Sequence, residues 1–278
     1  MQIRVGYDII QDCSGPTPMM LLLSMRPERI GDLVTPQTMR IEPDLPTRTY
    51  VDRFGNVCTR LLAGRGPVRV SAEFLVFDSG LPDQPAPDAI QHEVDDLPSD
   101  LLVFLLGSRY CETDQLVGPA WALFGGVAPG WKRVEAIVQW VHEWITFGYP
   151  NARNTRTAFE AFNERVGVCR DFAHLAVTLC RCMNIPARYC TGWLPDIGVP
   201  LDLPMDFSAW FEVFLDNQWW AFDARNNMPR LGRILMATGR DAADVAFLTS
   251  FGSSRFLKFE VVSTEETRQE LLQVNGLL

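Results

Sequence analysis

The sequence of 278 residues is short of histidine and of positive charge, and it lacks a long apolar run. It holds 3 histidines, and its 25 lysine and arginine residues face 34 aspartate and glutamate residues, which gives a formal net charge of −9. Nucleic-acid-binding proteins usually carry a basic stripe, so we expect no nucleic-acid partner. No apolar stretch approaches the roughly 20 residues that span a bilayer, so we expect no membrane partner.

The N-terminal residues and the cysteines favour a reducing compartment. The opening MQIRVGYDIIQD has no basic segment followed by an apolar one, which is the pattern of a secretory signal. The 7 cysteines are an odd number, and the chain is too long for a small disulfide framework, so free thiols are expected. We therefore expect a cytoplasmic protein. No spacing typical of zinc ligands and no dense acidic calcium loop occurs, so we expect neither a metal nor another cofactor.

Two different sequence patterns divide the chain. In residues 1–80, alternating apolar residues such as Ile3, Val5 and Tyr7, and turn residues between apolar runs, predict an all-β module, a small sandwich. Residues 81–98 are rich in proline and aspartate and are predicted to be a linker. Residues 99–278 begin with helical patterns and continue with two-residue periodicity. This order predicts an α+β core, with helices packed on an antiparallel sheet.

Several segments of the predicted core have patterns specific enough to be assigned as helices or strands. Apolar residues three and four positions apart predict a helix over 129–144. Thr157 and Glu160 match a capping box, so a short helix is expected to follow Thr157. A further helix is predicted from Cys169 to about Met183, and strands are predicted over 187–193, 207–215 and 218–223.

Cys169 is expected at the N-terminus of its helix, directly after Gly167 and Val168. The first turn of a helix has unpaired N–H groups and carries the positive end of the helix dipole, and both favour a thiolate. The same N–H groups can hold the oxyanion of an acyl-transfer intermediate. Cys169 is therefore a candidate nucleophile, and the alternative is a buried structural cysteine.

The strands over 207–215 and 218–223 are predicted to form a hairpin with Asp216 and Asn217 in its turn. With a two-residue loop, position 215 faces 218, 210 faces 223 and 208 faces 225. Asp223 then lies on the same face as Ser208, one diagonal step away, within reach of side chains. A cysteine nucleophile needs a base and a group that orients the base, so positions 208 and 223 are the candidate pair.

At this point the sequence resembles the bacterial transglutaminase-like superfamily. The resemblance covers most of the chain, because its motifs follow one another in the order typical of the family, and the N-terminal β module is similar to the domain that often precedes this core. The motifs are SRYCETD (108–114), GVCRDFAHL (167–175), RCMNIPARY (181–189), DFSAWFEV (206–213) and WWAFDAR (219–225).

The resemblance implies a papain-like fold and a Cys-His-Asp triad for hydrolysis or acyl transfer at amide bonds. Cys169 matches the nucleophile and Asp223 the acid, whereas the histidine position holds Ser208. A serine hydroxyl cannot take a proton from a thiol or give one to a leaving amine near neutral pH. The chain is thus expected to be an inactive or substrate-trapping variant of a cysteine enzyme. The alternatives are a natural pseudoenzyme that binds peptides or acts as a scaffold, and an enzyme whose base comes from the substrate or another residue.

Four further residues are candidates for substrate binding. Trp210 shares the predicted face of Ser208, and Val168, Arg170 and Asp171 surround the nucleophile. Core packing of Trp210 and ion pairing of Arg170 with Asp171 are the competing interpretations. The expected partner is a peptide, a protein or a small amide or amine. The 3 histidines, His92, His142 and His174, are interpreted as solvated or structural, so none is expected to act as the base.

Overall fold

The fold is described from a computed structural model, and the structure describes residues 1–200 and 205–266. The α-helices of the core precede its last strands, which is the order that the sequence patterns predict. The α-helices are α1 (Thr113–Phe124), α2 (Trp131–Trp144), α3 (Ala158–Glu164) and α4 (Cys169–Cys182). The 3₁₀ helices are η1 (Pro27–Asp32), η2 (Val94–Asp96), η3 (Ser99–Phe104) and η4 (Tyr149–Asn151).

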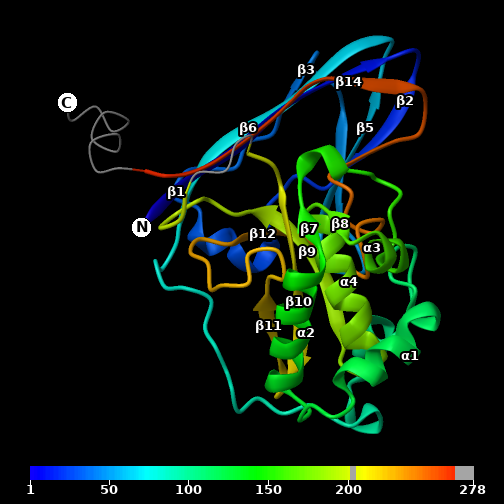
Figure 1. The fold of residues 1–278 in the computed structure, drawn as a ribbon. Coiled ribbons are helices and arrows are strands. Elements are labelled where there is room, and N and C mark those ends of the chain that lie inside the picture. The colour runs from blue at the N-terminus through cyan, green and yellow to red at the C-terminus, as the bar shows by residue number, and fades with distance from the viewer. Residues whose placement is uncertain (201–204, 267–278) are drawn as a thin grey trace.

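The N-terminal strands contribute to two four-stranded sheets that share a core (Figure 1). The first sheet has the order β14-β1-β6-β3 and the second has the order β13-β2-β5-β4. The strands of the first are β14 (Ser254–Glu265), β1 (Gln2–Cys13), β6 (Gly66–Phe77) and β3 (Arg40–Glu42). Those of the second are β13 (Leu248–Ser250), β2 (Thr17–Leu21), β5 (Val57–Ala63) and β4 (Thr47–Val51).

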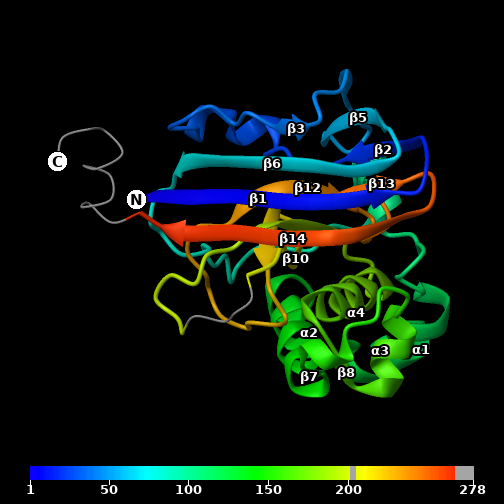
Figure 2. The same ribbon diagram turned by 90° about the horizontal axis from the view of Figure 1, so that it is seen from above.

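The last strands, β13 and β14, pair with N-terminal strands, whereas residues 99–278 were expected to form only the core. β14 runs antiparallel to β1 from the pair Ile3↔Glu265 to the pair Cys13↔Ser254, and Figure 2 shows β6, β1 and β14 side by side. β1 is already paired with β6 along its other edge, so β14 satisfies the backbone groups of its free edge. A sequence pattern of period two identifies a strand without saying which sheet receives it.

The core sheet has the order β11-β10-β9-β12, and helix α4 packs on one of its faces. Phe172, Leu175 and Leu179 of α4 pack in one apolar cluster with Phe211 and Val213 of β10. The expected α+β arrangement of helices on an antiparallel sheet is confirmed, and so is the capping box at Thr157 and Glu160. The remaining strands are β9 (Ala187–Trp193), β10 (Ser208–Leu215), β11 (Gln218–Phe222) and β12 (Ile234–Gly239), with a short pair of β7 (Thr146–Phe147) and β8 (Val166–Gly167).

The segment predicted to be a linker, 81–98, is attached to the core at several points. The main-chain N–H of Asp83 donates to the carbonyl oxygen of Arg230 at 3.0 Å, and its carboxylate pairs with Arg233 at 2.8 Å. Further along, the carbonyl oxygen of Ala89 accepts from the N–H of Trp131 at 3.1 Å. The segment therefore forms one wall of the core rather than a free connection.

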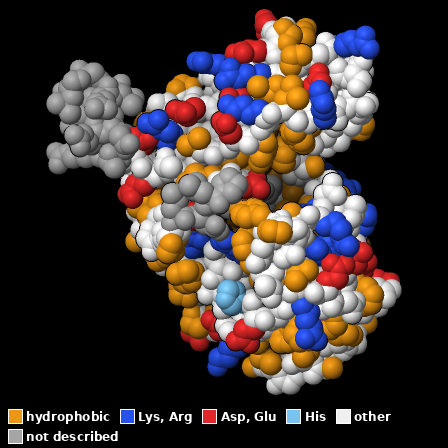
Figure 3. Space-filling model, turned by 45° about the horizontal axis from the view of Figure 1, so that its top comes forward, with side chains coloured by type: hydrophobic (Ala, Val, Ile, Leu, Met, Phe, Trp, Pro, Cys, Tyr) orange, Lys and Arg blue, Asp and Glu red, His pale blue; other side chains and the backbone are white. Residues whose placement is uncertain are grey.

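Within the described ranges, no helix is long and apolar enough to cross a membrane. The same residues contain no group of three or more side chains of the kinds that hold a metal ion. Acidic and basic side chains are interspersed over the face of the molecule that Figure 3 presents.

Candidate active site

Cys169 is the first residue of α4, as the sequence pattern predicts. It differs from the other six cysteines, which are all buried, because it keeps partial exposure. Asp171 fixes the first turn: one of its carboxylate oxygens accepts from the Val168 N–H at 2.9 Å and from Arg156 at 3.0 Å. The N–H groups of a first helical turn have no intrahelical partner, so this turn can receive a developing oxyanion.

Cys169 opens onto a small cavity of about 50 Å³, which has room for a few water molecules. Ser208, Asp206, Arg225 and Asn226 share this cavity with the thiol. The structure thus brings the candidate nucleophile and Ser208, the predicted base position, together. The rest of the described lining is Phe147, Tyr149, Leu194, Asp196, Met205, Phe207, Ala209 and Ser263.

The electrostatics of Cys169 differ from the sequence-based expectation. Burial raises the pKa of its thiol from 9.0 to about 12, and the charge of Asp206 adds to the rise. A backbone hydrogen bond from Ala209 and the charge of Arg225 lower the pKa, but they do not compensate. Position at a helix N-terminus favours a thiolate, yet the loss of hydration outweighs it here. The resting group is a thiol, which needs a base before it can attack.

We expect the rate of Cys169 alkylation by iodoacetamide to rise about tenfold per pH unit between pH 7 and roughly pH 11, because only the thiolate reacts. The rise should continue without a plateau near neutral pH. Peptide mapping by mass spectrometry separates Cys169 from the buried cysteines, which should react later. A plateau reached by about pH 7 would instead show a stabilised thiolate.

The predicted hairpin is confirmed over most of its length. Leu215 pairs with Gln218, and the turn residues Asp216 and Asn217 have φ angles of 49° and 63°. The positive angles are those of the tight turn that matches the twist of a hairpin. The ladder ends at the pair Phe211↔Phe222, however, so the expected facing of 210 with 223 and of 208 with 225 lies beyond it.

Asp223 begins a turn instead of extending the ladder. Its Oδ1 accepts from the Asn226 main-chain N–H at 2.9 Å, and its Oδ2 accepts from the Asn226 side chain at 2.7 Å. Its carbonyl oxygen accepts from the Asn227 N–H at 2.8 Å. Among the described hydrogen bonds none joins Asp223 to Ser208. Side chains of aspartate commonly accept from the backbone a few residues ahead, and these hydrogen bonds fix the Asp223 carboxylate.

Arg233 holds Asp223 from its other side, with Nη2 at 3.1 Å from Oδ2. Burial alone would raise the pKa of Asp223, but Arg233 and the hydrogen bonds from Asn226 lower it overall. The carboxylate therefore stays ionised around neutral pH. The guanidinium of Arg233 also lies 5.1 Å from the ring centre of Trp210 and pairs with Asp83 at 2.8 Å.

The four expected substrate-binding residues have other contacts. Trp210 is buried and lines a separate cavity with Arg188, Glu212 and Trp219. Its place follows from the alternation of β10, in which Ala209 and Phe211 face the helices.

The three residues around Cys169 build the helix end. Arg170 donates to the carbonyl oxygens of Arg153 and Asn154, and its guanidinium lies 5.3 Å from the ring centre of Tyr110. Asp171 is buried as the cap described above, and Val168 is the extended residue that enters α4. Ion pairing thus accounts for Arg170 and Asp171, which lie 3.5 Å apart.

None of the histidines lines the Cys169 cavity among the described residues. His174 is buried, lies between Tyr110 and Tyr189, and accepts from the Ala242 N–H at 3.1 Å. His92 accepts from the Asn217 N–H at 3.1 Å. His142 lies 3.1 Å from the carbonyl oxygens of Ala224 and Arg225, so it holds the turn that follows Asp223.

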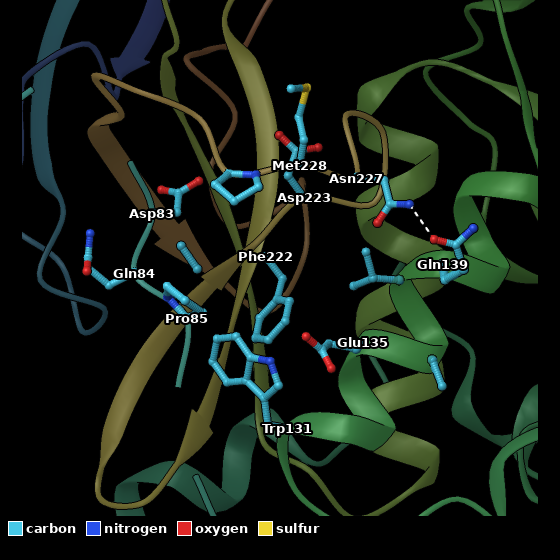
Figure 4. Close-up of a pocket in the computed structure, with 14 residues that line it drawn as sticks. Asp83, Gln84, Pro85, Trp131, Glu135, Gln139, Phe222, Asp223, Asn227 and Met228 are labelled. Carbon is cyan, nitrogen blue, oxygen red and sulfur yellow. Dashed lines mark hydrogen bonds between the residues drawn. The ribbon is translucent and has the colours of Figure 1, made fainter. Parts of the chain in front are cut away.

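A larger cavity of about 500 Å³ lies on the other side of Asp223 (Figure 4). Asp83, Gln84 and Pro85 form one wall in this view, and Glu135 and Gln139 of α2 form the opposite wall. Phe222 stands between them above Trp131. Asp223 and the following turn residues Asn227 and Met228 also line this large cavity.

Sequence reasoning missed Arg233 and Asn226 as parts of the site. Asn226 had a signal, because an aspartate three residues before an asparagine is typical of a side-chain-closed turn. No sequence pattern indicates Arg233, since its pairing with Asp223 depends on where the start of β12 lies in the folded sheet.

Several known proteins resemble this chain in sequence or in fold. Residues 122–224 match the model of the transglutaminase-like superfamily. A crystal structure from Cytophaga hutchinsonii, provisionally designated a cysteine protease, is 29% identical, covers 96% of this chain and 92% of its own, and has a TM-score of 0.80. An uncharacterized Mycobacterium leprae protein is 30% identical over 128 residues, 45% of this chain and 46% of its own, so the match spans about half of that relative.

The periplasmic domain of TgpA from Pseudomonas aeruginosa is more distant, with 16% identity over 78% of this chain and 75% of its own and a TM-score of 0.40. The matched segment 122–224 contains Cys169, Ser208 and Asp223, the three positions that the sequence motifs single out. The part of the chain that is similar to the transglutaminase-like superfamily therefore holds the candidate site.

Proposed function

We propose that the chain makes and breaks acyl bonds at amide-type substrates through a thioester on Cys169. The observation that supports this most is the position of Cys169, a partly exposed residue at the first turn of α4, in one cavity with Ser208. The C. hutchinsonii structure, which aligns over nearly the whole chain, adds support through its provisional designation as a cysteine protease. The substrate class is a peptide, a protein or a small amide, and the acceptor is water or an amine.

The chemistry runs in two steps. The Cys169 sulfur bonds to the acyl carbon, and the leaving amine departs with its electron pair and the proton that the thiol gave up. Water or an amine then attacks the thioester, releases an acid or a new amide and returns a proton to the sulfur. First-turn N–H groups stabilise the oxyanion in both steps.

Proton transfer is expected to be slow at this site. The thiol has a pKa of about 12, and Ser208 stands where the family carries its histidine. A positioned acid–base group contributes about 10²–10⁴-fold to rate, so its loss slows amide cleavage by that order. We infer a chain that turns over slowly or traps its acyl group, with the substrate amine as the available base.

The test is release of amine or ammonia from a panel of peptide and small amides. The unchanged chain should release product slowly, and Cys169→Ala should release none. A matched control is Cys13→Ala, which alters a cysteine buried in another cluster. Equal release by the unchanged chain and Cys169→Ala would contradict the proposed function.

The second candidate is a binding module without turnover. The cavity of about 500 Å³ beside Trp131 supports it, because it has room for a ligand, whereas the cavity at Cys169 has not. Binding of a peptide that persists unchanged in Cys169→Ala, together with no acylation of the thiol, would favour this candidate.

A further inference from the structure

We propose that the Cys169 site selects substrates with a cationic group beside the acyl carbon, and that the carboxylate of Asp206 determines this specificity. The inference rests on the proposed cysteine chemistry and adds the substrate class, an amide with an ammonium or guanidinium group next to the cleaved bond. It is carried by the place of Asp206 in the Cys169 cavity and by the charges around it.

Asp206 lies just before β10, two residues ahead of Ser208, and lines the same cavity as Cys169. It is an exposed residue, so a substrate that approaches Cys169 from solvent can meet its side chain. Its Oδ1 accepts from the Phe207 N–H at 2.7 Å, which holds the side chain in place. The hydrogen bonds of the described residues include none to its Oδ2. This oxygen is therefore open to a ligand.

The charge of Asp206 has no ion-pair partner among the described residues. The other acidic group of the cavity lining, Asp196, is paired with Arg230 at 2.8 Å. Arg225 supplies a basic side chain to the lining, and its guanidinium lies 4.3 Å from the ring centre of Phe147. Loss of hydration raises the pKa of Asp206, although the residue as a whole is exposed, and no cation is among the groups that lower it. Asp206 thus adds an uncompensated negative charge to the cavity.

This charge acts on the sulfur of Cys169. After the loss of hydration, Asp206 is the largest cause of the raised pKa of the thiol, and Arg225 lowers that pKa less strongly. Asp223 also raises it. The charges around the sulfur therefore attract a cation and repel an anion. A bound cation would also offset Asp206 and lower the pKa of the thiol, so a cationic substrate would promote its own attack by the thiolate.

A cationic substrate also matches the hydrogen-bonding needs of Asp206. Ammonium and guanidinium groups only donate hydrogen bonds, and a carboxylate only accepts them. A neutral substrate that covered Asp206 would leave its charge without a partner, which costs binding free energy. An anionic substrate would add repulsion to that cost.

The experiment measures how fast Cys169 reacts with three methanethiosulfonates, which carry a 2-aminoethyl cation, a methyl group or a 2-sulfonatoethyl anion. In each reaction the thiolate bonds to the sulfenyl sulfur of the reagent, and methanesulfinate leaves with the electron pair of the broken S–S bond. All three reagents need the same thiolate, so ratios of their rates cancel any change in the pKa of the thiol. Peptide mapping by mass spectrometry assigns the rates to Cys169, because the other six cysteines are buried. The neutral thiol 2-mercaptoethanol gives the intrinsic ratios.

At pH 7 and low salt, the cation-to-anion rate ratio at Cys169 should exceed that of 2-mercaptoethanol. Asp206→Asn should lower this ratio by at least about fivefold, the effect that one charge about 7 Å away has in water on two reagents of opposite sign. The variant keeps an oxygen that can accept from the Phe207 N–H, so the local backbone is preserved. Asp206→Glu keeps the charge, and its ratio should stay within about twofold of that of the unchanged chain.

Asp216→Asn is the matched control, because it removes the same charge from the turn at the opposite end of β10, where asparagine tolerates the φ of 49°. Its ratio should stay within about twofold of that of the unchanged chain. A measurement without any variant is the addition of salt, which should bring the ratio closer to that of 2-mercaptoethanol. The proposal is overturned if the unchanged chain shows the ratio of 2-mercaptoethanol at low salt. It is also overturned if Asp206→Asn leaves the ratio unchanged, or if Asp216→Asn lowers it equally.

The thiosulfonates need no acyl chemistry, so this test is separate from that of the proposed function. If the ratio depends on Asp206 but no amide, cationic or neutral, releases amine, the proposed function fails and the charge selectivity stands. If amides are cleaved at Cys169 but the ratio does not depend on Asp206, the assignment of Asp206 fails alone.

Discussion

Replacement of Arg233 by methionine is expected to lower the free energy of unfolding by about 3–5 kcal/mol, because it leaves buried charge without a partner. The Asp223 side chain is 2% exposed and that of Arg233 is 9% exposed, so water cannot replace the lost pairing. Asp83 loses its ion pair as well and keeps the hydrogen bond from the Arg230 main-chain N–H, so one attachment of the segment 81–98 is lost. Urea unfolding at neutral pH measures the change.

Arg255→Met is the matched control, because it removes an arginine from an ion pair with Asp12 whose arginine side chain is 75% exposed. Exposed pairs contribute about 0–1 kcal/mol, so the control should unfold nearly like the unchanged chain. The pKa of Asp223 is lowered in the fold, so its stabilisation is present above the ordinary carboxyl pKa and is lost as pH falls. The difference between Arg233→Met and the unchanged chain should therefore shrink in acid. Equal losses for the two variants would contradict the described role of Arg233.

Activated esters are expected to acylate Cys169 faster than amides by about the factor that free cysteine shows at the same pH, whereas a site with a positioned acid–base group would narrow that factor by about 10²–10⁴-fold. A nitrophenolate leaves without a proton, whereas a leaving amine must receive one, and no imidazole stands in the described cavity to give it. Burst release of p-nitrophenol, compared with amine release from the matching amide, measures the ratio. Free cysteine at the same pH gives the intrinsic difference.

The Ser208→His variant should narrow this ratio, since an imidazole at this position would protonate the leaving amine. A ratio about 10²-fold or more below that of free cysteine in the unchanged chain would contradict the described lack of an acid–base group.

Local patterns predicted much of the fold and part of the site. The Gly-Val-Cys sequence placed Cys169 at the first turn of α4, and the Asp216-Asn217 turn set the hairpin register. Both depend on neighbours within a few residues. The pairing of β14 with β1 depends on residues about 250 positions apart, and no local pattern specifies it.

The chemistry of the site was harder to predict for the same reason. Helix position favours a Cys169 thiolate, but the thiol's pKa is set by how deeply the surrounding chain buries it and by the charge of Asp206. The diagonal between positions 208 and 223 follows from an ideal hairpin. The turn at Asn226 and the pairing of Asp223 with Arg233 replace that ideal geometry.

The most direct measurement is a peptide map of the chain after reaction with p-nitrophenyl acetate at about pH 9, where more of the Cys169 thiol is ionised. The expected result is an acetyl thioester, labile to hydroxylamine, on Cys169 and on none of the buried cysteines. It should be absent from Cys169→Ala. A thioester on another cysteine, or an unmodified Cys169 after prolonged reaction, would contradict the central claim that Cys169 is the nucleophile of this site.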